Sequence, residues 1–557
     1  MGSEMCIRDS PHPTQCVTHA TIQLSSGFAS QVKVAQLAGY VAEHSAYHHG
    51  EASLGGTIVG MAQTFVGSNN IALLYGAGQF GTRLMGGKDA ASPRYIFTRL
   101  PKLTRLIFHP DDDALLEYLE DDGQKIEPKY YIPILPMVLV NGADGIGTGW
   151  STSVPNFNPR EIVANLRRLM AGDEAQPMAP WYRGFDGVVS PADTRGSYIT
   201  YGTIAPSTSD PRALRISELP VRRWTQDYKE SVLEPMLQAA DKEGKAAAHA
   251  LSEVRENHTD TTVSFTLRFT SEEAAQSAMR AGVHKQLKLS SSLSTSNMTL
   301  FDAHGRIQKY EAVEPILRDF YDLRLSYYEK RKLFLQDKLS AEWSKLDNRM
   351  RFVLAVVSGE LRIANRKKAD LVAELHEKGY ASFEPPAKRA AIGDDDDEAP
   401  AAPEADGVAA SARGFDYLLS MPLWSLTREK VEQLRAECDA KEQELQKLIV
   451  TTPRQLWERD LDAFEEGLLE WEEEIALAAN AARRDEAKGK ARGKANSGAI
   501  SGARKKAASI AMDADSDSDY DDVPKRKKPA QKRKAPNAPT PAAVSYTHLR
   551  AHETDSY

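Results

Sequence analysis

The chain has 557 residues, of which 41% are hydrophobic and 27% charged, and its formal net charge at pH 7 is −8. This length and apolar content allow three or four domains with hydrophobic cores. The three cysteines, Cys6, Cys16 and Cys438, exclude a disulfide framework and lack metal-ligand spacing. No apolar run approaches the roughly 20 residues of a membrane span, so we expect no membrane partner.

A negative net charge would argue against a nucleic-acid partner if the charges were evenly spread along the chain. They are unevenly spread. Acidic runs occupy residues 394–398 and 513–522, whereas basic residues gather at 99–105 and in the tail. A basic surface in one part of the chain is therefore compatible with DNA binding.

The two ends of the chain show no periodic pattern. Residues 5–10, within the segment 1–30, and residues 546–553, within the segment 544–557, resemble translated sequencing adapters. We therefore predict that the folded protein begins near residue 31 and that both end segments are artefacts.

Residues 31–150 mix helical and β-like patterns. Apolar residues recur at helical spacing from Val34 to Val41, which predicts a helix. The apolar runs at 71–75 and 132–140 read as strands.

Residues 151–305 have an α/β pattern. Apolar and polar residues alternate from Val263 to Phe269, which predicts a strand with one buried face. Residues 224–237 have helical character that ends near Pro235.

Residues 306–471 predict a long antiparallel coiled coil. A charged helix is expected at 309–347, with a seam of Ile316, Phe320, Leu323, Tyr327 and Phe334, and a returning helix at 426–448. Between them, residues 385–413 are acidic and Ala/Pro-rich, which is typical of a disordered insertion. Residues 415–424 are unusually apolar and aromatic for the end of such a coil.

Residues 472–543 predict a disordered charged tail. Its basic blocks at 525–528 and 532–534 are typical of a nuclear import signal, which favours the nucleus. The alternative is a solvated tail that contacts DNA electrostatically.

The segment Gly86–Tyr95 places the permanent cation of Arg94 beside a phenol in a glycine-rich loop. A tyrosine oxygen with its ordinary pKa of about 10 is a poor nucleophile and needs a positive field to attack phosphorus. A guanidinium supplies that field and binds phosphate oxygens as a fork. An Arg-Tyr pair by itself is more often structural, with the phenol hydrogen-bonded at the edge of a core.

Several longer sequence words accompany this pair in a fixed order, namely Ser45–Glu51, Phe65–Asn70, Gly78–Leu84, Lys88–Thr98, Pro136–Gly142 and Gly145–Trp150. Together they resemble the DNA-cleaving core of eukaryotic type IIA DNA topoisomerase (topoisomerase II) from about residue 31 to about residue 471. The resemblance implies a multidomain α/β and α fold. Its parts would be a winged-helix DNA-binding domain at 31–150, an α/β tower domain at 151–305, and a coiled coil with a dimerisation tip (the exit gate) at 306–471.

The resemblance also implies roles for individual residues. Tyr95 matches the nucleophile that forms a 5′-phosphotyrosyl bond, Arg94 the group that neutralises the transition state, and His49 a phosphate ligand near the reacting atom. His48 either contacts phosphate or packs. From residue type alone, both histidines are more simply read as helix-end or core groups.

Further residues are expected to contact DNA. Ile146, between Gly145 and Gly147, matches the wedge that inserts between base steps; its alternative is core burial. Lys88, Arg83 and Gln79 are expected phosphate contacts that position the duplex without reading its sequence.

The family's ATP-binding and magnesium-binding domains would lie upstream of residue 31 and find no match. We expect Mg²⁺ and ATP to be bound by those domains and no metal ligands in this chain. The acidic run Asp111–Asp113 reads as a solvated loop. Gly76–Gly81 fits a dinucleotide motif but lacks the following helix and acidic residue.

The leading hypothesis is an ATP-dependent isomerase that passes one DNA duplex through a transient double-strand break in another, relaxing supercoils and decatenating chromosomes. Two Tyr95 residues of a homodimer would cut opposite strands of double-stranded DNA. The fragment alone is expected to be inactive. The alternative is a noncatalytic, DNA-binding and dimerising chromatin protein on the same scaffold. A purely structural coiled-coil protein would leave residues 31–150 unexplained.

Overall fold

The structure is a computed structural model that describes residues 13–25, 31–45, 47–121, 123–147, 149–194, 196–237, 251–363, 366–383, 414–421, 428–478 and 480–481. The chain divides into two compact units, Met1–Ile475 and Ala476–Tyr557. The predicted insertion at 385–413, the basic tail and the segment 544–557 lie outside the described residues.

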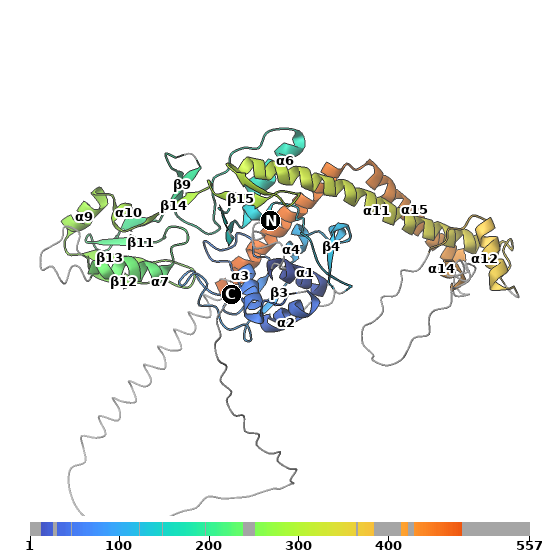
Figure 1. Ribbon diagram of the computed structural model, residues 1–557, viewed down its shortest axis with the longest axis horizontal. Coiled ribbons are helices and arrows are strands. Elements are labelled where there is room, and N and C mark those ends of the chain that lie inside the picture. The colour runs from blue at the N-terminus through green and yellow to red at the C-terminus, as the bar shows by residue number, and fades with distance from the viewer. Residues whose placement is uncertain are drawn as a thin grey trace, which may run out of the picture. The chain divides into compact units, whose positions relative to one another are not determined.

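Three helices and a small sheet form the first part of the chain (Figure 1). The helices are α1 (Pro13–Ser25), α2 (Val34–His44) and α3 (Glu51–Ala62). The antiparallel sheet has the order β1 (Val32–Lys33), β3 (Phe97–Arg99), β2 (Tyr75–Ala77). The predicted helical stripe is confirmed, because Val34, Leu37, Ala38 and Val41 are buried in the core between these elements.

The prediction that the folded protein begins at residue 31 is wrong for α1. Cys16, Val17 and Ala20 lie on one face of this helix and are buried in the same core as α2 and α3. His19 Nδ1 lies 3.1 Å from the hydroxyl of Tyr131.

A second core joins segments that are far apart in sequence. It includes residues of α4 (Lys102–Ile107), α5 (Met137–Val140), α6 (Pro159–Ala171) and the helical residues 453–478. The hairpins around it are β4–β5 (Tyr118–Asp121, Gln124–Pro128), β6–β7 (Ala143–Gly147, Trp150–Val154) and β15–β16 (Met298–Phe301, Ile307–Tyr310).

Local sequence explains the ends of α6. Asn158 caps its first turn by accepting a hydrogen bond from the backbone N–H of Arg160, and Pro159 suits the first helical position. Gly172 ends the helix at φ 90°, which a residue with a side chain rarely adopts.

The predicted strand at 132–140 is wrong, because residues 137–140 form the short helix α5 after Pro136. A short, fully buried apolar run does not distinguish a strand from a helix by its periodicity. Similarly, the strand expected at 71–75 is displaced to β2, which begins at Tyr75.

The α/β part contains two antiparallel sheets. The first has the order β10 (Ile204–Pro206), β11 (Ala213–Ile216), β13 (Phe265–Phe269), β12 (Leu251–Glu256), and the second has the order β14 (Ser290–Ser294), β9 (Ser197–Tyr201), β8 (Val188–Pro191). The predicted strand is confirmed, since Phe265, Leu267 and Phe269 are buried and the residues between them are half-buried. The helical elements here include α7 (Thr225–Tyr228), η2 (Lys229–Leu233), α9 (Glu272–Arg280) and α10 (Val283–Gln286). The predicted end near Pro235 is wrong, because residues 234–237 are helical as well.

Two long helices form the predicted antiparallel pair, but the expected seam residues Ile316 and Phe320 pack in the second core. α11 (Val313–Val357) spans 45 residues, and α15 (Arg428–Val450) runs beside it (Figure 1). Lys332 Nζ donates to the carbonyl of Ile449, and Lys441 pairs with Glu342, so the helices are antiparallel. At the far end of α11, α12 (Lys368–Glu377) and α14 (Asp416–Leu419) share an apolar cluster with it.

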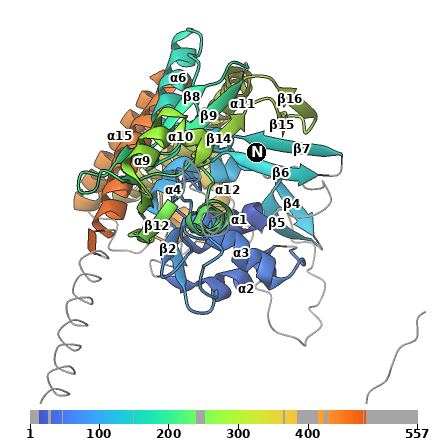
Figure 2. The same ribbon diagram turned by 90° about the vertical axis from the view of Figure 1, so that its left-hand side faces the viewer.

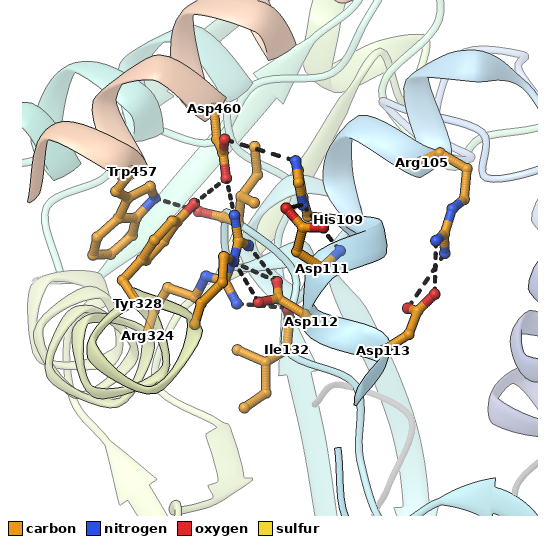
Figure 3. A network of polar contacts seen from close by, with 12 residues as sticks. Arg105, His109, Asp111, Asp112, Asp113, Ile132, Arg324, Tyr328, Trp457 and Asp460 are labelled. Atoms are coloured by element: carbon orange, nitrogen blue, oxygen red, sulfur yellow. Dashed lines mark hydrogen bonds and ion pairs between the residues drawn. The ribbon is translucent and has the colours of Figure 1, made fainter. Parts of the chain in front are cut away.

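A buried network of charges ties the start of the coiled coil to the rest of the fold (Figure 3). Asp112, in the short helix η1 (Pro110–Leu115), accepts hydrogen bonds from Arg324 (2.7 Å) and from Nε of Arg331 (2.7 Å). Both arginines belong to α11 and are almost completely buried. The expectation of a solvated loop at Asp111–Asp113 is therefore wrong for Asp112.

The network continues into the helix that returns from the coiled coil. Asp460 accepts hydrogen bonds from Nη1 of Arg331 (2.5 Å) and from the hydroxyl of Tyr328 (2.7 Å). Trp457, one turn before Asp460, is fully buried, stacks on Tyr328 and donates its indole N–H to Ile134 O (2.9 Å). Three separate segments are thereby held together by buried charges.

The helix containing Trp457 continues past the predicted start of the disordered tail at residue 472. Glu472 pairs with Arg160 and Glu474 with Arg99. The acidic residues thus belong to a packed helix. None of the described helices is long and apolar enough to span a bilayer.

Candidate active site

The loop from residue 78 to residue 96 connects two paired strands. β2 and β3 are antiparallel, with Tyr75 opposite Arg99 and Ala77 opposite Phe97. The loop therefore begins and ends at the same end of the β2–β3 pair. Asp89 closes it internally by accepting hydrogen bonds from the backbone N–H (2.8 Å) and the hydroxyl (2.6 Å) of Thr82.

Tyr95 lies at the end of this loop, two residues before β3. Its side chain is 78% exposed, whereas the next residue, Ile96, is 1% exposed and packs in the core. The backbone around it is fixed to the start of α2, because Val34 N–H donates to Ile96 O (3.0 Å) and Ala35 N–H donates to Pro93 O (3.1 Å). The phenol is thus presented to solvent from an anchored backbone.

The helix pair α2–α3 brings the two histidines to the same part of the fold as the tyrosine loop. His48 and His49 lie in the connection before α3, both exposed, with ring centroids 4.6 Å apart. In the second turn of α3, a Cβ atom on Gly55 would lie 3.1 Å from Pro93, so the loop packs closely against this helix. Exposed N–H groups and the helix dipole make the start of α3 favourable for an anion.

The other predicted phosphate contacts have different environments. Arg94, Lys88 and Gln79 are exposed, and the Gln79 amide lies 3.5 Å from Asp89. Arg83 requires a correction, because its side chain is only 6% exposed and both of its terminal nitrogens bind Glu218. Because this guanidinium is buried and paired with a buried carboxylate, the structure does not present Arg83 to a DNA phosphate, and its observed role is to bind Glu218.

Ile146 lies on the β6–β7 hairpin, which extends outward in Figure 2. Its side chain is 87% exposed and is paired across the hairpin with Ser151. Core burial is therefore excluded. Asp144, two residues earlier, is held by Arg222 (2.5 Å) and by the hydroxyl of Ser153 (2.7 Å), which supports the base of the hairpin.

The sequence analysis did not identify Glu218 as part of this region. It lies 135 residues from Arg83, and no local pattern links the two residues.

A magnesium ion needs several oxygen ligands that converge on one point. Within the described residues, no three His, Cys, Asp or Glu side chains come together as a metal-binding group. In the acidic run Asp111–Asp113, Asp112 and Asp113 pair with arginines, and Asp111 lies beside His109. These residues do not fit a magnesium ion.

The chain is similar in sequence to several characterised proteins. It is 50% identical over 442 residues to DNA topoisomerase 2-alpha of Cricetulus griseus, and 50% identical over 443 residues to DNA topoisomerase 2-beta of Homo sapiens. Each match covers 79% of this chain and 28% or 27% of the relative, respectively. DNA topoisomerase 2 of Pisum sativum is 47% identical over 447 residues, which are 78% of this chain and 30% of that protein. The chain therefore spans less than a third of the length of these relatives.

The fold is also similar to a solved structure, the DNA-binding, cleavage and re-ligation domain of Plasmodium falciparum topoisomerase II. The TM-score is 0.73 at 40% sequence identity, and the match covers 86% of this chain and 63% of that one. The family model for the A-type subunits of DNA gyrase/topoisomerase IV matches residues 16–462, which include most of α1. The chain therefore belongs to this DNA gyrase/topoisomerase IV family, and within it the chain is similar to the eukaryotic DNA topoisomerase 2 proteins.

Proposed function

We propose that this chain is the DNA-cleaving part of a type II DNA topoisomerase, with Tyr95 as its nucleophile. The observation that carries the proposal is the contrast at Tyr95, whose phenol is exposed while its backbone is anchored to α2. A nucleophile for a substrate as large as duplex DNA must be accessible and yet fixed in direction. The similarity to DNA topoisomerase 2 proteins supports the same assignment.

In the proposed reaction, the Tyr95 oxygen attacks a backbone phosphorus atom. A new Oη–P bond forms, the P–O3′ bond breaks, and the phenol proton leaves while the 3′ oxygen gains a proton. The phosphodiester is exchanged for a phosphotyrosyl ester, so attack by the 3′-hydroxyl reverses the step without an external energy source.

Arg94 is proposed to neutralise charge on the phosphorane-like transition state. Loss of one such preorganised donor costs about 3 kcal/mol in enzymes that stabilise an oxyanion. His49 is proposed to bind the same phosphate from the start of α3, with His48 as a neighbouring contact. Both histidines are exposed beside the packed loop, as a phosphate ligand requires.

The proposed DNA surface includes Lys88 and Gln79 on the loop and Ile146 on its hairpin. An exposed isoleucine between two glycines is suited to insert between base steps and bend the duplex. Magnesium and ATP are proposed to be bound by other parts of the full protein, since the described residues do not fit the metal. No step above depends on either group.

The proposed active form is a homodimer in the nucleus. Two Tyr95 residues would cut opposite strands, which a single copy cannot do without releasing one strand to reach the other. The antiparallel coiled coil, with its tip cluster around Phe415, offers a second region for contact between copies. In the full protein, such a dimer would pass one duplex through another with ATP.

The test uses supercoiled plasmid, magnesium and human DNA topoisomerase 2-beta in which this chain replaces the matching stretch. Trapping with denaturant should give linear DNA with covalently attached protein, and Tyr95→Phe should abolish the adduct without changing DNA affinity. Absence of any adduct, with DNA binding intact, would favour the noncatalytic, dimerising chromatin protein.

A further inference from the structure

A segment of the α/β part contacts the loop that carries Tyr95. The segment comprises residues 218–226, which we name the clamp segment. Its Glu218 binds Arg83 of the loop through two hydrogen bonds, Nη2 to Oε1 at 2.5 Å and Nη1 to Oε2 at 3.3 Å. Only 6% of the Arg83 side chain and 3% of the Glu218 side chain are exposed. A buried pair is expensive to break from one side, because the remaining charge loses its partner away from water.

The clamp segment also binds the backbone of the loop. Thr225 N–H donates to Arg83 O (3.3 Å), and Gln226 N–H donates to Leu84 O (3.0 Å). These N–H groups belong to the first turn of α7 and have no acceptors within their own helix. The loop therefore supplies the acceptors that complete the start of α7.

Trp224 fills the remaining space beside the loop. A Cβ atom on Gly86 would lie 2.4 Å from the Trp224 ring, so only glycine allows the ring to pack this closely. On its other side, Trp224 makes an edge contact with Phe65, at 5.7 Å between ring centroids. The indole of Trp224 thus packs between Gly86 of the loop and Phe65.

The loop is stiff enough to transmit this restraint to its far half. Gly87 N–H donates to Thr82 O (2.9 Å), and Ala91 N–H donates to Gln79 O (2.9 Å). Asp89 adds its two bonds to Thr82. A displacement of Arg83 or Gly86 would therefore also displace the segment that leads to Tyr95.

We infer that the clamp segment sets the position of the Tyr95 loop, and that Glu218 and Trp224 are positioning residues for DNA cleavage. The inference rests on the proposed function of Tyr95. Neither residue need touch DNA, because each acts through Arg83 or Gly86. A misplacement of reacting atoms by about 1 Å costs roughly 100-fold in rate.

The experiment uses the same chimaeric topoisomerase and compares Glu218→Gln with Glu253→Gln. Glu253 is a matched control because it lies in the same α/β part, on the exposed surface of β12, where it pairs with Arg255. We expect Glu218→Gln to lower the single-turnover rate of covalent adduct formation at saturating DNA by about 10- to 100-fold. DNA affinity, measured by fluorescence anisotropy, should change less than about twofold in both variants.

Separating rate from affinity distinguishes positioning from simple loss of fold. A partly unfolded variant would lose DNA affinity and cleavage together, and its thermal unfolding would show this. If Glu218→Gln does not fold, Trp224→Phe provides the second test, since it keeps an aromatic ring but removes part of the contact with Gly86. We expect it to lower the cleavage rate at unchanged DNA affinity.

The outcomes separate the two proposals. Adduct formation at the wild-type rate in Glu218→Gln and Trp224→Phe would overturn the positioning role and leave Tyr95 as the nucleophile. No adduct in the unmodified chimaera would overturn both proposals. A lower rate with unchanged affinity in Glu218→Gln, but not in Glu253→Gln, would support the positioning role.

Discussion

Asp112→Asn removes the central negative charge of the buried network and keeps the shape of the side chain. The carboxylate accepts hydrogen bonds from two arginines that are 0% and 3% exposed. After the substitution, Arg331 still has Asp460, whereas Arg324 has the carbonyl of Ile132, the face of Tyr328 and at most a neutral amide oxygen in place of the carboxylate. The new amide N–H groups also face guanidinium N–H groups and find no acceptor there.

Removing one partner of a buried ion pair typically costs about 3–5 kcal/mol, so we expect the free energy of unfolding to fall by about that amount. The measurement is urea unfolding followed by circular dichroism and tryptophan fluorescence. Trp457 is a local reporter, because it stacks on Tyr328 within the network.

Asp113→Asn is the matched control, since it makes the same chemical change one residue further on. Asp113 pairs with Arg105 at a site where the side chains are 37% and 21% exposed, respectively. Exposed pairs of this kind contribute up to about 1 kcal/mol. An Asp112→Asn loss no larger than that of Asp113→Asn would refute the view that the network holds the segments together.

Three further predictions concern pH, the clamp and the hairpin. Burial acts to raise the pKa of Asp112, but its arginines outweigh burial and hold that pKa below its usual value near 3.9. The contribution of this carboxylate to the free energy of unfolding is therefore present above about pH 4 and is lost as the pH falls further. At that lower pH, the free energies of unfolding of wild type and Asp112→Asn, measured in urea, should become equal. Gly86→Ala should cost about 1–3 kcal/mol more than Gly172→Ala, because both have positive φ but only Gly86 meets Trp224; equal costs would contradict the close packing. Ile146→Ser should leave stability within about 0.5 kcal/mol, since the side chain is 87% exposed, and reduce DNA bending measured by energy transfer; unchanged bending would exclude the wedge.

Much of the fold follows from patterns that are local in the sequence. The coiled coil and the strand β13 were predicted because a single apolar face repeats along each of them. Local pattern failed at residues 137–140, where a fully buried run has no polar face to reveal its period. It also missed α1, in which the polar residues Thr18, His19 and Thr21 are buried as well as the apolar ones, so no single apolar stripe marks the helix.

In the candidate site, too, the residues marked by a local pattern were predicted, and those that depend on distant partners were not. The sequence predicted the loop and its tyrosine, because the glycines and the adjacent cation lie within one short contiguous segment. It misassigned Arg83, because the partner Glu218 lies 135 residues away. Asp112 was misread for the same reason, since Arg324 is 212 residues distant. Whether a charge is solvated, paired or bound to DNA depends on such remote partners.

The length of α11 gives the buried network a mechanical role. From Arg331 to Val357 the helix extends about 39 Å beyond the network, at roughly 1.5 Å per residue. If α11 tilted by about 5° around Arg331, its distal end would move sideways by about 3 Å, close to the length of a hydrogen bond. A contact surface at the distal end of α11 can therefore have a defined position only if the helix is held rigidly at Arg331. Charge-assisted hydrogen bonds have preferred directions, so a tilt of α11 at Arg331 would distort several of them at once.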